Sequence, residues 1–279
     1  MLSGTFFAYK WSIERVGFMN KSWLISLGLV VCVGLGCSEQ QGSPFQDSPK
    51  QNNKVVASEL KAKKTNQERQ ITLHGTRNTR DLGGLPASSG MYVKEGVIYR
   101  SGTLCYIDND DAEVLKGKKI KSVIDLRTSG EIEREGRDIA AFTDSLDKVY
   151  NCPLLCTAGC YEWAYVSYIK KHNHESIAKF FHILADQNNY PVLFHCSAGK
   201  DRTGILAALL LELLGTPRSI IMDDYLQSQR NSEGLKVDKE WLQTVFMFVD
   251  KEGGVEQFLK NRGVSSEDMR KIKEQLLTK

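Results

Sequence analysis

The sequence carries little net charge, although a quarter of its residues are charged. Its 279 residues include 37 Lys and Arg against 34 Asp and Glu, which gives a net charge of +3 at neutral pH. Residues 1–36 hold three basic residues and one acidic residue, so the remainder carries a net charge of +1. A protein that binds nucleic acid normally shows a basic patch or a run of basic residues. We therefore expect no nucleic-acid partner.

The apolar stretch near the N-terminus is short for a membrane span. It runs over fourteen residues from Trp23 to Gly36 behind Lys21, whereas a transmembrane helix needs about 20 residues. Its length suits the core of a secretory signal. Met19 resembles a natural start, which would make residues 1–18 an extension ahead of that signal.

The end of this stretch resembles a bacterial lipoprotein signal. Gly36 precedes Cys37, and a polar tail follows from Ser38. Cys37 would then become the lipidated first residue of the mature chain, although Gly34 stands where that motif prefers Leu or a relative. The alternative is an uncleaved membrane anchor. Both interpretations predict a protein held outside the cytoplasmic membrane.

Large apolar side chains are scarce over residues 37–70. This segment is rich in Gln, Asn, Ser, Lys and Glu and contains Pro44 and Pro49. A segment of this composition cannot bury enough apolar surface to fold alone. We predict a flexible tether that spans roughly 30 Å as a random coil.

The chain lacks a nucleotide-binding P-loop, because Gly199-Lys200 has neither the upstream glycine nor the following Ser or Thr. It has a different loop between Pro191 and Gly204. A short apolar run, Val192 to Phe194, predicts a buried strand, and the apolar residues 205–214 predict a core helix. The sequence between them is His-Cys-Ser-Ala-Gly-Lys-Asp-Arg-Thr-Gly. The local plan is therefore strand, loop and helix.

Five residues separate the cysteine of this loop from its arginine: Ser197, Ala198, Gly199, Lys200 and Asp201. A loop of this length can turn the N–H groups of residues 197–202 onto one anion at a helix N-terminus, with Cys196 beneath it. The N–H dipoles and the charges of Lys200 and Arg202 would favour the nucleophilic thiolate. Arg202 would hold two phosphate oxygens with its planar fork, and Thr203 would donate a hydrogen bond to the sulfur. The loop is predicted to bind phosphate over a nucleophile.

Residues 195–204 resemble the signature loop of the cysteine-dependent protein-tyrosine and dual-specificity phosphatases. The Lys-Asp pair within the loop resembles the loop found in a bacterial branch of that family. Its members are implied to act on phosphotyrosine, in some cases on phosphoserine or phosphothreonine, and on phosphoinositides. Four other segments of the sequence also resemble motifs of this branch; they are residues 77–84, 97–102, 125–127 and 224–226.

The acid that protonates the leaving group is left open by the sequence, because the Trp-Pro-Asp loop of the large tyrosine phosphatases is absent. The resemblance offers Asp125, which ends a predicted strand over Ile120 to Leu126. Ligands of α/β sheets bind beyond the carboxyl ends of the strands, where Asp125 and Cys196 both fall. The alternative is that Asp125 orients Arg202 or the loop. Asp201, within the loop, is the competing acid.

Three further groups of residues permit more than one interpretation. Arg80, Asp81 and Arg100 are predicted to form an ion network that braces the loop from behind, in preference to contacting substrate. Cys152, Cys156 and Cys160 are spaced by four residues, and in an exported protein this favours a local disulfide over a zinc site. Tyr161, Trp163, Tyr165 and Tyr168 would either line a substrate mouth or pack in an aromatic segment.

We expect a single α/β domain over residues 71–279, with a central, mainly parallel sheet flanked by helices. Its predicted function is hydrolysis of phosphoric monoesters, above all phosphotyrosine, through a cysteinyl-phosphate and without metal or cofactor. The first alternative is a phosphoinositide or inositol-phosphate phosphatase. A second is a binding module for phosphorylated ligands that has lost catalysis, against which the intact Cys196 and Arg202 argue. The sequence gives no indication of the oligomeric state.

Overall fold

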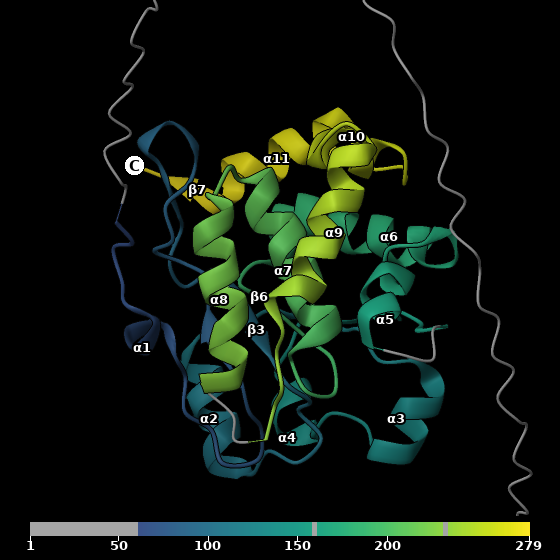
Figure 1. Ribbon diagram of the computed structural model, residues 1–279. Coiled ribbons are helices and arrows are strands. Elements are labelled where there is room, and N and C mark those ends of the chain that lie inside the picture. Colours follow the sequence, from purple (N-terminus) through teal and green to yellow (C-terminus); the bar gives the residue numbers. More distant parts are fainter. Residues whose placement is uncertain (1–60, 158–160, 231–233) are drawn as a thin grey trace, which may run out of the picture. The chain divides into compact units, whose positions relative to one another are not determined.

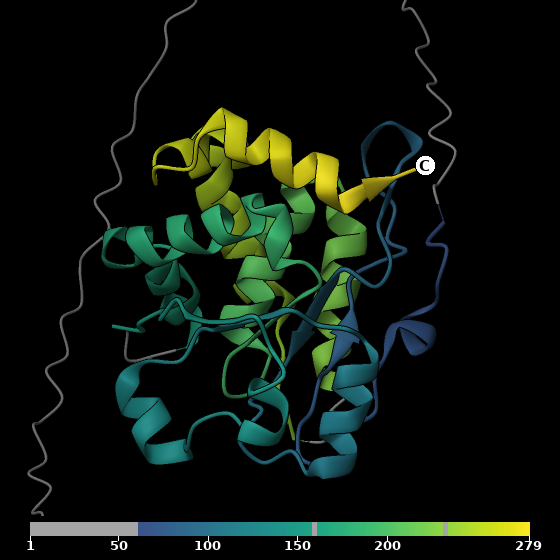
Figure 2. The ribbon, with the colours of Figure 1, turned by 180° about the vertical axis from the view of Figure 1, so that it is seen from behind.

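The computed structural model describes residues 61–157, 161–230 and 234–279 (Figures 1 and 2). The predicted export segment 1–36, Cys37, most of the predicted tether and Cys160 lie outside these residues. Within them, no helix is long and apolar enough to cross a membrane.

A five-stranded sheet lies at the centre of the described part of the chain. Its order is β1 (Arg80–Asp81), β3 (Ile98–Ser101), β6 (Val192–His195), β4 (Ser122–Asp125) and β5 (Lys148–Asn151). Strands β3, β6, β4 and β5 are parallel, and β1 pairs antiparallel with β3 at the edge. A separate antiparallel pair joins β2 (Tyr92–Val93) to β7 (Leu277–Thr278). The predicted mainly parallel α/β sheet is confirmed.

The helices fall into two groups by the face of the sheet that they cover, with short helices between them. One face carries α6 (His174–Ala185), α7 (Asp201–Leu213), α8 (Arg218–Arg230), α9 (Lys239–Lys251), α10 (Val255–Lys260) and α11 (Ser266–Leu276). The other face carries α2 (Asn109–Gly117) and α4 (Ala140–Thr143). The remaining helices are α1 (Asn66–Arg69), α3 (Ser129–Glu135) and α5 (Tyr161–Tyr168), with 3-10 turns at Ser88–Gly90, Lys171–Asn173 and Gln187–Asn189. Figure 1 shows α7, α8 and α9 in front of the sheet, and α2 lies on the side seen in Figure 2.

Alternation along β6 divides the core between the two faces of the sheet. Val192 and Phe194 pack into the larger cluster under α6 and α7, whereas Leu193 packs into the smaller cluster with α2 and α4. All three side chains are fully buried. Because successive side chains of a strand point to opposite faces, an apolar run of this kind belongs to a strand that is covered on both sides. This is why the strand that precedes Cys196 lies at the centre of the sheet.

Residues 63–70 belong to the folded part of the chain, so the predicted tether boundary at residue 70 is wrong. The Lys63 amide donates to the Gly84 carbonyl at 2.9 Å, and Thr65 caps α1 in a capping box with Glu68. The Arg69 side chain is buried. Polar composition predicted disorder here, but the segment is held by ion pairs and main-chain hydrogen bonds, which composition does not reveal.

Candidate active site

Cys196 lies at the carboxyl end of the central strand, directly before the loop that opens α7. It is 2% exposed and follows His195, the last residue of β6. Helix α7 has thirteen residues and begins at Asp201, with Lys200 at its N-cap but no side-chain cap. The N-terminus of such a helix favours an anion. Strand, loop and helix therefore occupy the predicted positions.

The amide N–H groups of the loop are available to a ligand. Those of Ser197, Ala198, Gly199, Asp201 and Arg202 have no hydrogen-bond acceptor among the described residues. Uncommitted N–H groups beside a buried group are rare in folded proteins, because each costs free energy unless a partner or water satisfies it. This arrangement suits an anion that accepts several hydrogen bonds at once, as a phosphate does.

Gly199 fixes the shape of the loop. Its φ is +66°, and an added Cβ would lie 2.5 Å from the Ser101 carbonyl oxygen. Its own carbonyl accepts hydrogen bonds from Asn78 Nδ2 at 2.7 Å and Arg100 Nη2 at 2.8 Å. A side chain would meet backbone, and a positive φ is costly for any residue with a Cβ. Asn78 and Arg100, which lie outside the loop, therefore hold it in place through the Gly199 carbonyl.

Behind this anchor, three arginines surround one carboxylate. Asp224 of α8 pairs with Arg69 at 2.9 Å, Arg80 at 3.0 Å and Arg100 at 2.9 Å. All four side chains are almost completely buried. Burial would raise the pKa of Asp224, but the three positive charges hold it well below its ordinary value. The bracing network predicted for Arg80 and Arg100 is present and joined to the phosphate loop through Gly199.

Asp81 does not belong to that network, contrary to the prediction. Its carboxylate instead accepts hydrogen bonds from the amides of Gly83 at 2.7 Å and Gly96 at 2.8 Å. Burial raises the pKa of Asp81, although these two amides act against the rise. Asp81 therefore shapes the turn after β1, because its position next to Arg80 in the sequence does not bring its carboxylate to the arginine cluster.

Arg202 is oriented by Glu131, a residue that the sequence analysis did not single out. Arg202 Nη1 and Nη2 each donate to one Glu131 carboxylate oxygen at 2.6 Å. Burial would raise the pKa of Glu131, but the hydrogen bonds from Arg202 and Thr128 lower it to about 2. Burial would lower the pKa of Arg202, but the negative charges of Cys196 and Glu131 raise it. Glu131 takes the end of the guanidinium, which leaves the Nε side to a ligand.

We predict that Glu131→Gln lowers kcat/KM for an aryl phosphate by about tenfold or more, because Arg202 loses the charge that fixes its orientation. Glutamine still completes the capping box with Thr128, so α3 should persist. The matched control is the exposed Glu133 on the same helix. Equal activities of Glu131→Gln and Glu133→Gln would contradict an orienting role.

Helix α3 contacts the loop at a second point, one helical turn from the first. Ser197 Oγ donates to Glu135 Oε1 at 2.8 Å, and Glu135 Oε2 lies 3.5 Å from Arg127 Nη1. Residues four apart share one face of a helix. Glu131 and Glu135 therefore hold the two ends of the phosphate loop from one side. The Thr128-x-x-Glu131 cap was visible in the sequence, whereas these partners were not.

Asp125 lies beside the loop, as predicted, but its carboxylate is engaged by Arg127. It accepts from the Arg127 amide at 2.9 Å, from Nε at 3.0 and 3.1 Å, and from Nη2 at 2.8 Å. It is 5% exposed and lines a hollow of about 440 Å³ with residues that include Asp138 and Tyr150, none of them from the phosphate loop. This geometry resembles that of an orienting group, and the role of Asp125 as general acid stays a prediction.

His195 places a positive charge under the start of the loop. Its Nε2 lies 2.9 Å from Asp138 Oδ2 and its Nδ1 3.9 Å from Asp125 Oδ1. Burial would lower the pKa of His195, but the negative charges of Asp138 and Asp125 raise it to about 9. The protonated ring can donate from Nδ1 to the Cys196 carbonyl, which is 3.3 Å away. His195 thus supports Cys196 from the strand side.

Asp201 and Lys200 face helices α5 and α9. Tyr165 Oη donates to Asp201 Oδ1 at 2.5 Å. Lys200 Nζ donates to the Lys236 carbonyl at 2.9 Å and lies 5.5 Å from the centre of the Trp241 ring. Both loop side chains therefore contact protein, and Lys200 in particular is fixed by the segment that precedes α9. Their predicted contacts with substrate stay predictions.

Two other predicted groups are placed by the structure. Thr203 is fully buried, and its Oγ1 has no hydrogen-bond partner among the described residues. Tyr165 is buried in the aromatic cluster with Tyr225 and Trp241, whereas Trp163 is exposed. The aromatic segment therefore packs at Tyr165 and leaves Trp163 to solvent.

Cys152 is buried with a free thiol, and burial raises its pKa to about 12. It is therefore excluded from the predicted disulfide. A bond between Cys156 and Cys160 stays a prediction, because Cys160 lies outside the described residues.

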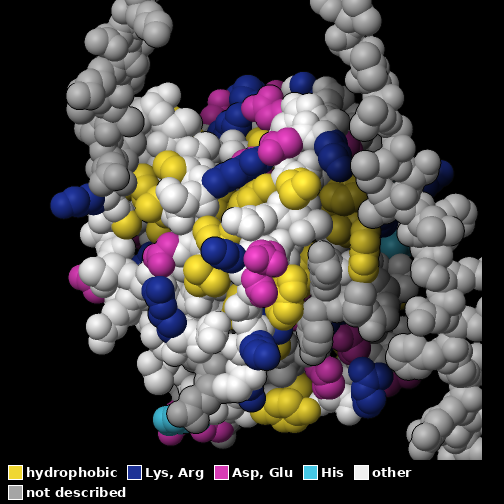
Figure 3. Space-filling view, in the orientation of Figure 1, with side chains coloured by type: hydrophobic (Ala, Val, Ile, Leu, Met, Phe, Trp, Pro, Cys, Tyr) yellow, Lys and Arg dark blue, Asp and Glu magenta, His cyan; other side chains and the backbone are white. Residues whose placement is uncertain are grey.

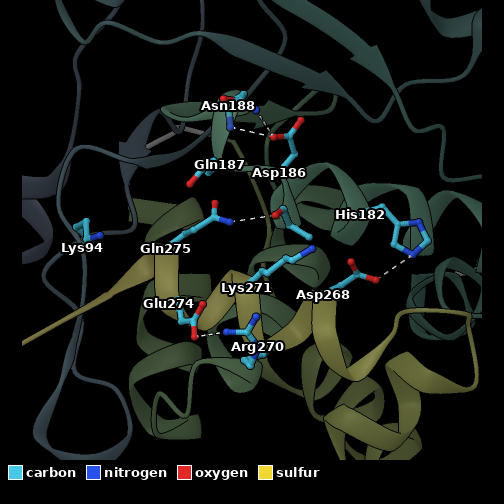
Figure 4. Close-up of a pocket in the computed structure, with 11 residues that line it drawn as sticks. Lys94, His182, Asp186, Gln187, Asn188, Asp268, Arg270, Lys271, Glu274 and Gln275 are labelled. Carbon is cyan, nitrogen blue, oxygen red and sulfur yellow. Dashed lines mark hydrogen bonds and ion pairs between the residues drawn. The ribbon is translucent and has the colours of Figure 1, made fainter.

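A groove on the described surface is separate from this loop (Figure 4). It has a volume of about 800 Å³ and is lined by residues of α6, α11 and the turn before β6, such as His182, Asp186 and Gln275. The turn precedes β6 and the phosphate loop follows it, so the groove and the loop lie at opposite ends of this strand. Its charged side chains largely pair with one another, as His182 does with Asp268 at 3.6 Å. Basic and acidic side chains are also interspersed on the face shown in Figure 3.

A buried cysteine between a parallel strand and a helix, with uncommitted amides and an oriented arginine, defines the phosphate loop of the cysteine-based phosphatases. Comparison with known proteins agrees with this class. A model of the tyrosine phosphatase family matches residues 71–278, and the chain belongs to that family.

Individual relatives match parts of the chain. A tyrosine-protein phosphatase of Nostoc commune is 31% identical over 166 residues, which cover 56% of this chain and 56% of that protein. The triple specificity protein phosphatase PtpB of Mycobacterium tuberculosis is 60% identical over 38 residues, 14% of each chain. The crystal structure of P. aeruginosa TpbA matches with a TM-score of 0.40 and 15% identity over 62% of this chain and 89% of that one. The chain thus spans little more than half the length of the first of these relatives.

Proposed function

We propose that this protein hydrolyses phosphoric monoesters, with phosphotyrosine in proteins as its main substrate and phosphoserine or phosphothreonine as further ones. The observation that carries the proposal is the set of uncommitted amides beside the buried Cys196, with the Arg202 guanidinium oriented by Glu131. These amides and the guanidinium can satisfy the oxygens of a phosphoryl group while sulfur approaches phosphorus.

Each step follows from these groups. Phosphate binds to the amides of residues 197–202 and to the Nε side of Arg202. The Cys196 thiolate forms an S–P bond while the ester P–O bond breaks, and an acid gives its proton to the departing oxygen. Water then attacks phosphorus and gives a proton back to that acid, the S–P bond breaks, and the thiolate and inorganic phosphate are released. The amides hold the oxygens through both steps, so no group has to reorganise as charge moves.

Turnover of p-nitrophenyl phosphate tests this proposal against a binding module without catalysis. Panels of phosphopeptides and of phosphoinositides then separate a protein phosphatase from the alternative lipid or inositol-phosphate phosphatase. A higher kcat/KM on a phosphotyrosine peptide than on any phosphoinositide is the expected result. The reverse order would replace the main substrate with the alternative.

We predict that Asp125→Asn, and not Asp201→Asn, makes the rate depend more steeply on leaving-group pKa. A missing acid slows a phenyl phosphate much more than a nitrophenyl phosphate, because only the phenyl oxygen needs the proton. Asp201→Asn should lower the rates on both substrates alike, since Asp201 binds Tyr165 at the start of α7. Steepening in Asp201→Asn, with a uniform loss in Asp125→Asn, would reverse the assignment. A uniform loss in both would fit the bond of Asp125 to Arg127.

We further propose that the protein is exported and anchored to a membrane through lipid on Cys37. The support is the sequence: a fourteen-residue apolar run ends at Gly36-Cys37 before a polar segment. The expected result is that the full chain partitions into membranes and that Cys37→Ser releases it. Recovery of both forms in the same fraction would contradict a lipid anchor at Cys37.

A further inference from the structure

A hollow beside the phosphate loop is not used by the mechanism above. It has a volume of about 270 Å³; Ser197 and Ala198 of the loop form one side, and Thr76, Arg77, Tyr106 and Glu135 are among the other residues that line it. Ser197 directly follows Cys196. The hollow therefore shares two residues with the phosphate loop and adjoins the place where the phosphate of a substrate would bind.

Main-chain hydrogen bonds fix the walls of the hollow relative to the loop. The Thr103 amide donates to the Ser197 carbonyl at 3.0 Å, and the Gly102 amide donates to the Arg77 carbonyl at 2.9 Å. The packing is close, because an added Cβ on Gly102 would lie 3.0 Å from the Arg77 oxygen and 3.3 Å from the Ser197 oxygen. The backbone that carries Arg77 is therefore held at a constant place beside the site. A fixed position of this kind is what a specificity group requires.

The hollow offers one available cation and one exposed aromatic ring. Arg77 is exposed, and its guanidinium makes no ion pair or hydrogen bond with any described residue. Tyr106 is 63% exposed. The acidic wall residue, Glu135, is already engaged by Ser197 at 2.8 Å and lies 3.5 Å from Arg127. A ligand group that enters here meets an unpaired guanidinium that can accept one carboxylate in its planar fork.

We propose that this hollow is a specificity subsite in which Arg77 binds an acidic residue adjacent to the phosphorylated residue of a peptide substrate, with Tyr106 packing against that peptide. The inference rests on the proposed function, because it assumes that the loop binds the substrate phosphate. A single guanidinium beside the Glu135 carboxylate suits one acidic side chain. Several ring phosphates of an inositol would bring further negative charge against Glu135.

The test uses three phosphotyrosine peptides that differ only in the residues flanking the phosphotyrosine, which are Glu, Ala or Lys. The unchanged protein should show a kcat/KM about tenfold higher on the Glu peptide than on the Ala peptide. Arg77→Gln should remove this preference and leave p-nitrophenyl phosphate unaffected. Arg77→Glu should prefer the Lys peptide. The matched control is Arg270→Gln, an exposed arginine in the groove of Figure 4, which should keep the preference.

Three outcomes would overturn the subsite. The first is that the unchanged protein has equal kcat/KM on all three peptides. The second is that Arg77→Gln lowers kcat/KM equally on p-nitrophenyl phosphate and on the Glu peptide. The third is that Arg77→Gln lowers kcat/KM more on inositol hexakisphosphate than on the Glu peptide. Failure of the unchanged protein to turn over p-nitrophenyl phosphate would contradict the proposed function instead. Binding of the three peptides, measured by calorimetry, would then still report on Arg77, because binding does not need the reaction.

Discussion

Cys196→Ser is expected to lower turnover of p-nitrophenyl phosphate by at least about a thousandfold while phosphate binding persists. A serine hydroxyl is far from ionised at neutral pH, so no nucleophile forms in the loop, and covalent catalysis contributes several powers of ten to such reactions. Binding should survive because it depends on the amides of residues 197–202 and on Arg202, and the substitution changes neither. Removal of the negative thiolate charge should even strengthen the binding of the phosphate dianion, because the two charges repel each other.

The measurement pairs turnover with calorimetric titration of inorganic phosphate. Cys105→Ser is the matched control, because it also replaces a buried thiol but lies outside the loop, where Thr103 Oγ1 donates to its sulfur at 3.1 Å. This control should keep most of the activity. Residual turnover above about one per cent in Cys196→Ser, or an equal loss in Cys105→Ser, would exclude Cys196 as the nucleophile.

Asp224→Asn is expected to destabilise the protein by about 3–5 kcal/mol, because it leaves three buried guanidinium groups without their shared carboxylate. The adjacent Asp223 is the matched control. It is half exposed and lies 3.4 Å from Arg230 at the surface, so Asp223→Asn should cost less than about 1 kcal/mol. Urea unfolding of both variants measures the difference. Equal midpoints would show that the buried cluster contributes nothing to stability.

The same cluster predicts how stability depends on pH. The pKa of Asp224 is held below its ordinary value of 3.8 in the folded protein. The stabilisation that ionised Asp224 gives the folded protein is therefore complete above the ordinary pKa. It is lost as the pH falls toward the lower folded-state pKa, because the unfolded chain binds the proton first. The unchanged protein should lose stability in this acidic range, and the slope should be smaller in Asp224→Asn. An identical slope in both proteins would assign the acid sensitivity to other carboxylates.

Features set by neighbouring residues could be predicted from the sequence. The apolar run at 192–194, the loop and the apolar helix after it define β6, the phosphate loop and α7, because periodicity is a local property. Helix caps are local in the same way, because Asp108 caps α2 and Ser265 caps α11 through an amide of the first helical turn. The parallel sheet followed from strands that alternate with helices.

Contacts between distant segments could not be predicted. Glu131 and Arg202 are 71 residues apart, and their pairing depends on where α3 lies after the sheet has formed. The same holds for Arg69, which is 155 residues from Asp224. A charged residue in a sequence gives no sign of its partner, so the loop could be predicted from its own residues, whereas the carboxylates that contact it could not.

The burial of Arg69 links the segment before residue 71 to the phosphate loop mechanically. Arg69 precedes the residue at which the family match begins, yet it shares Asp224 with Arg100, which holds the Gly199 carbonyl. A protein shortened to start at Ile71 would keep every loop residue and lose one of the three cations that fix the anchor. Tension on the segment before α1, or its cleavage by a protease, would likewise act on the phosphate loop through this one carboxylate.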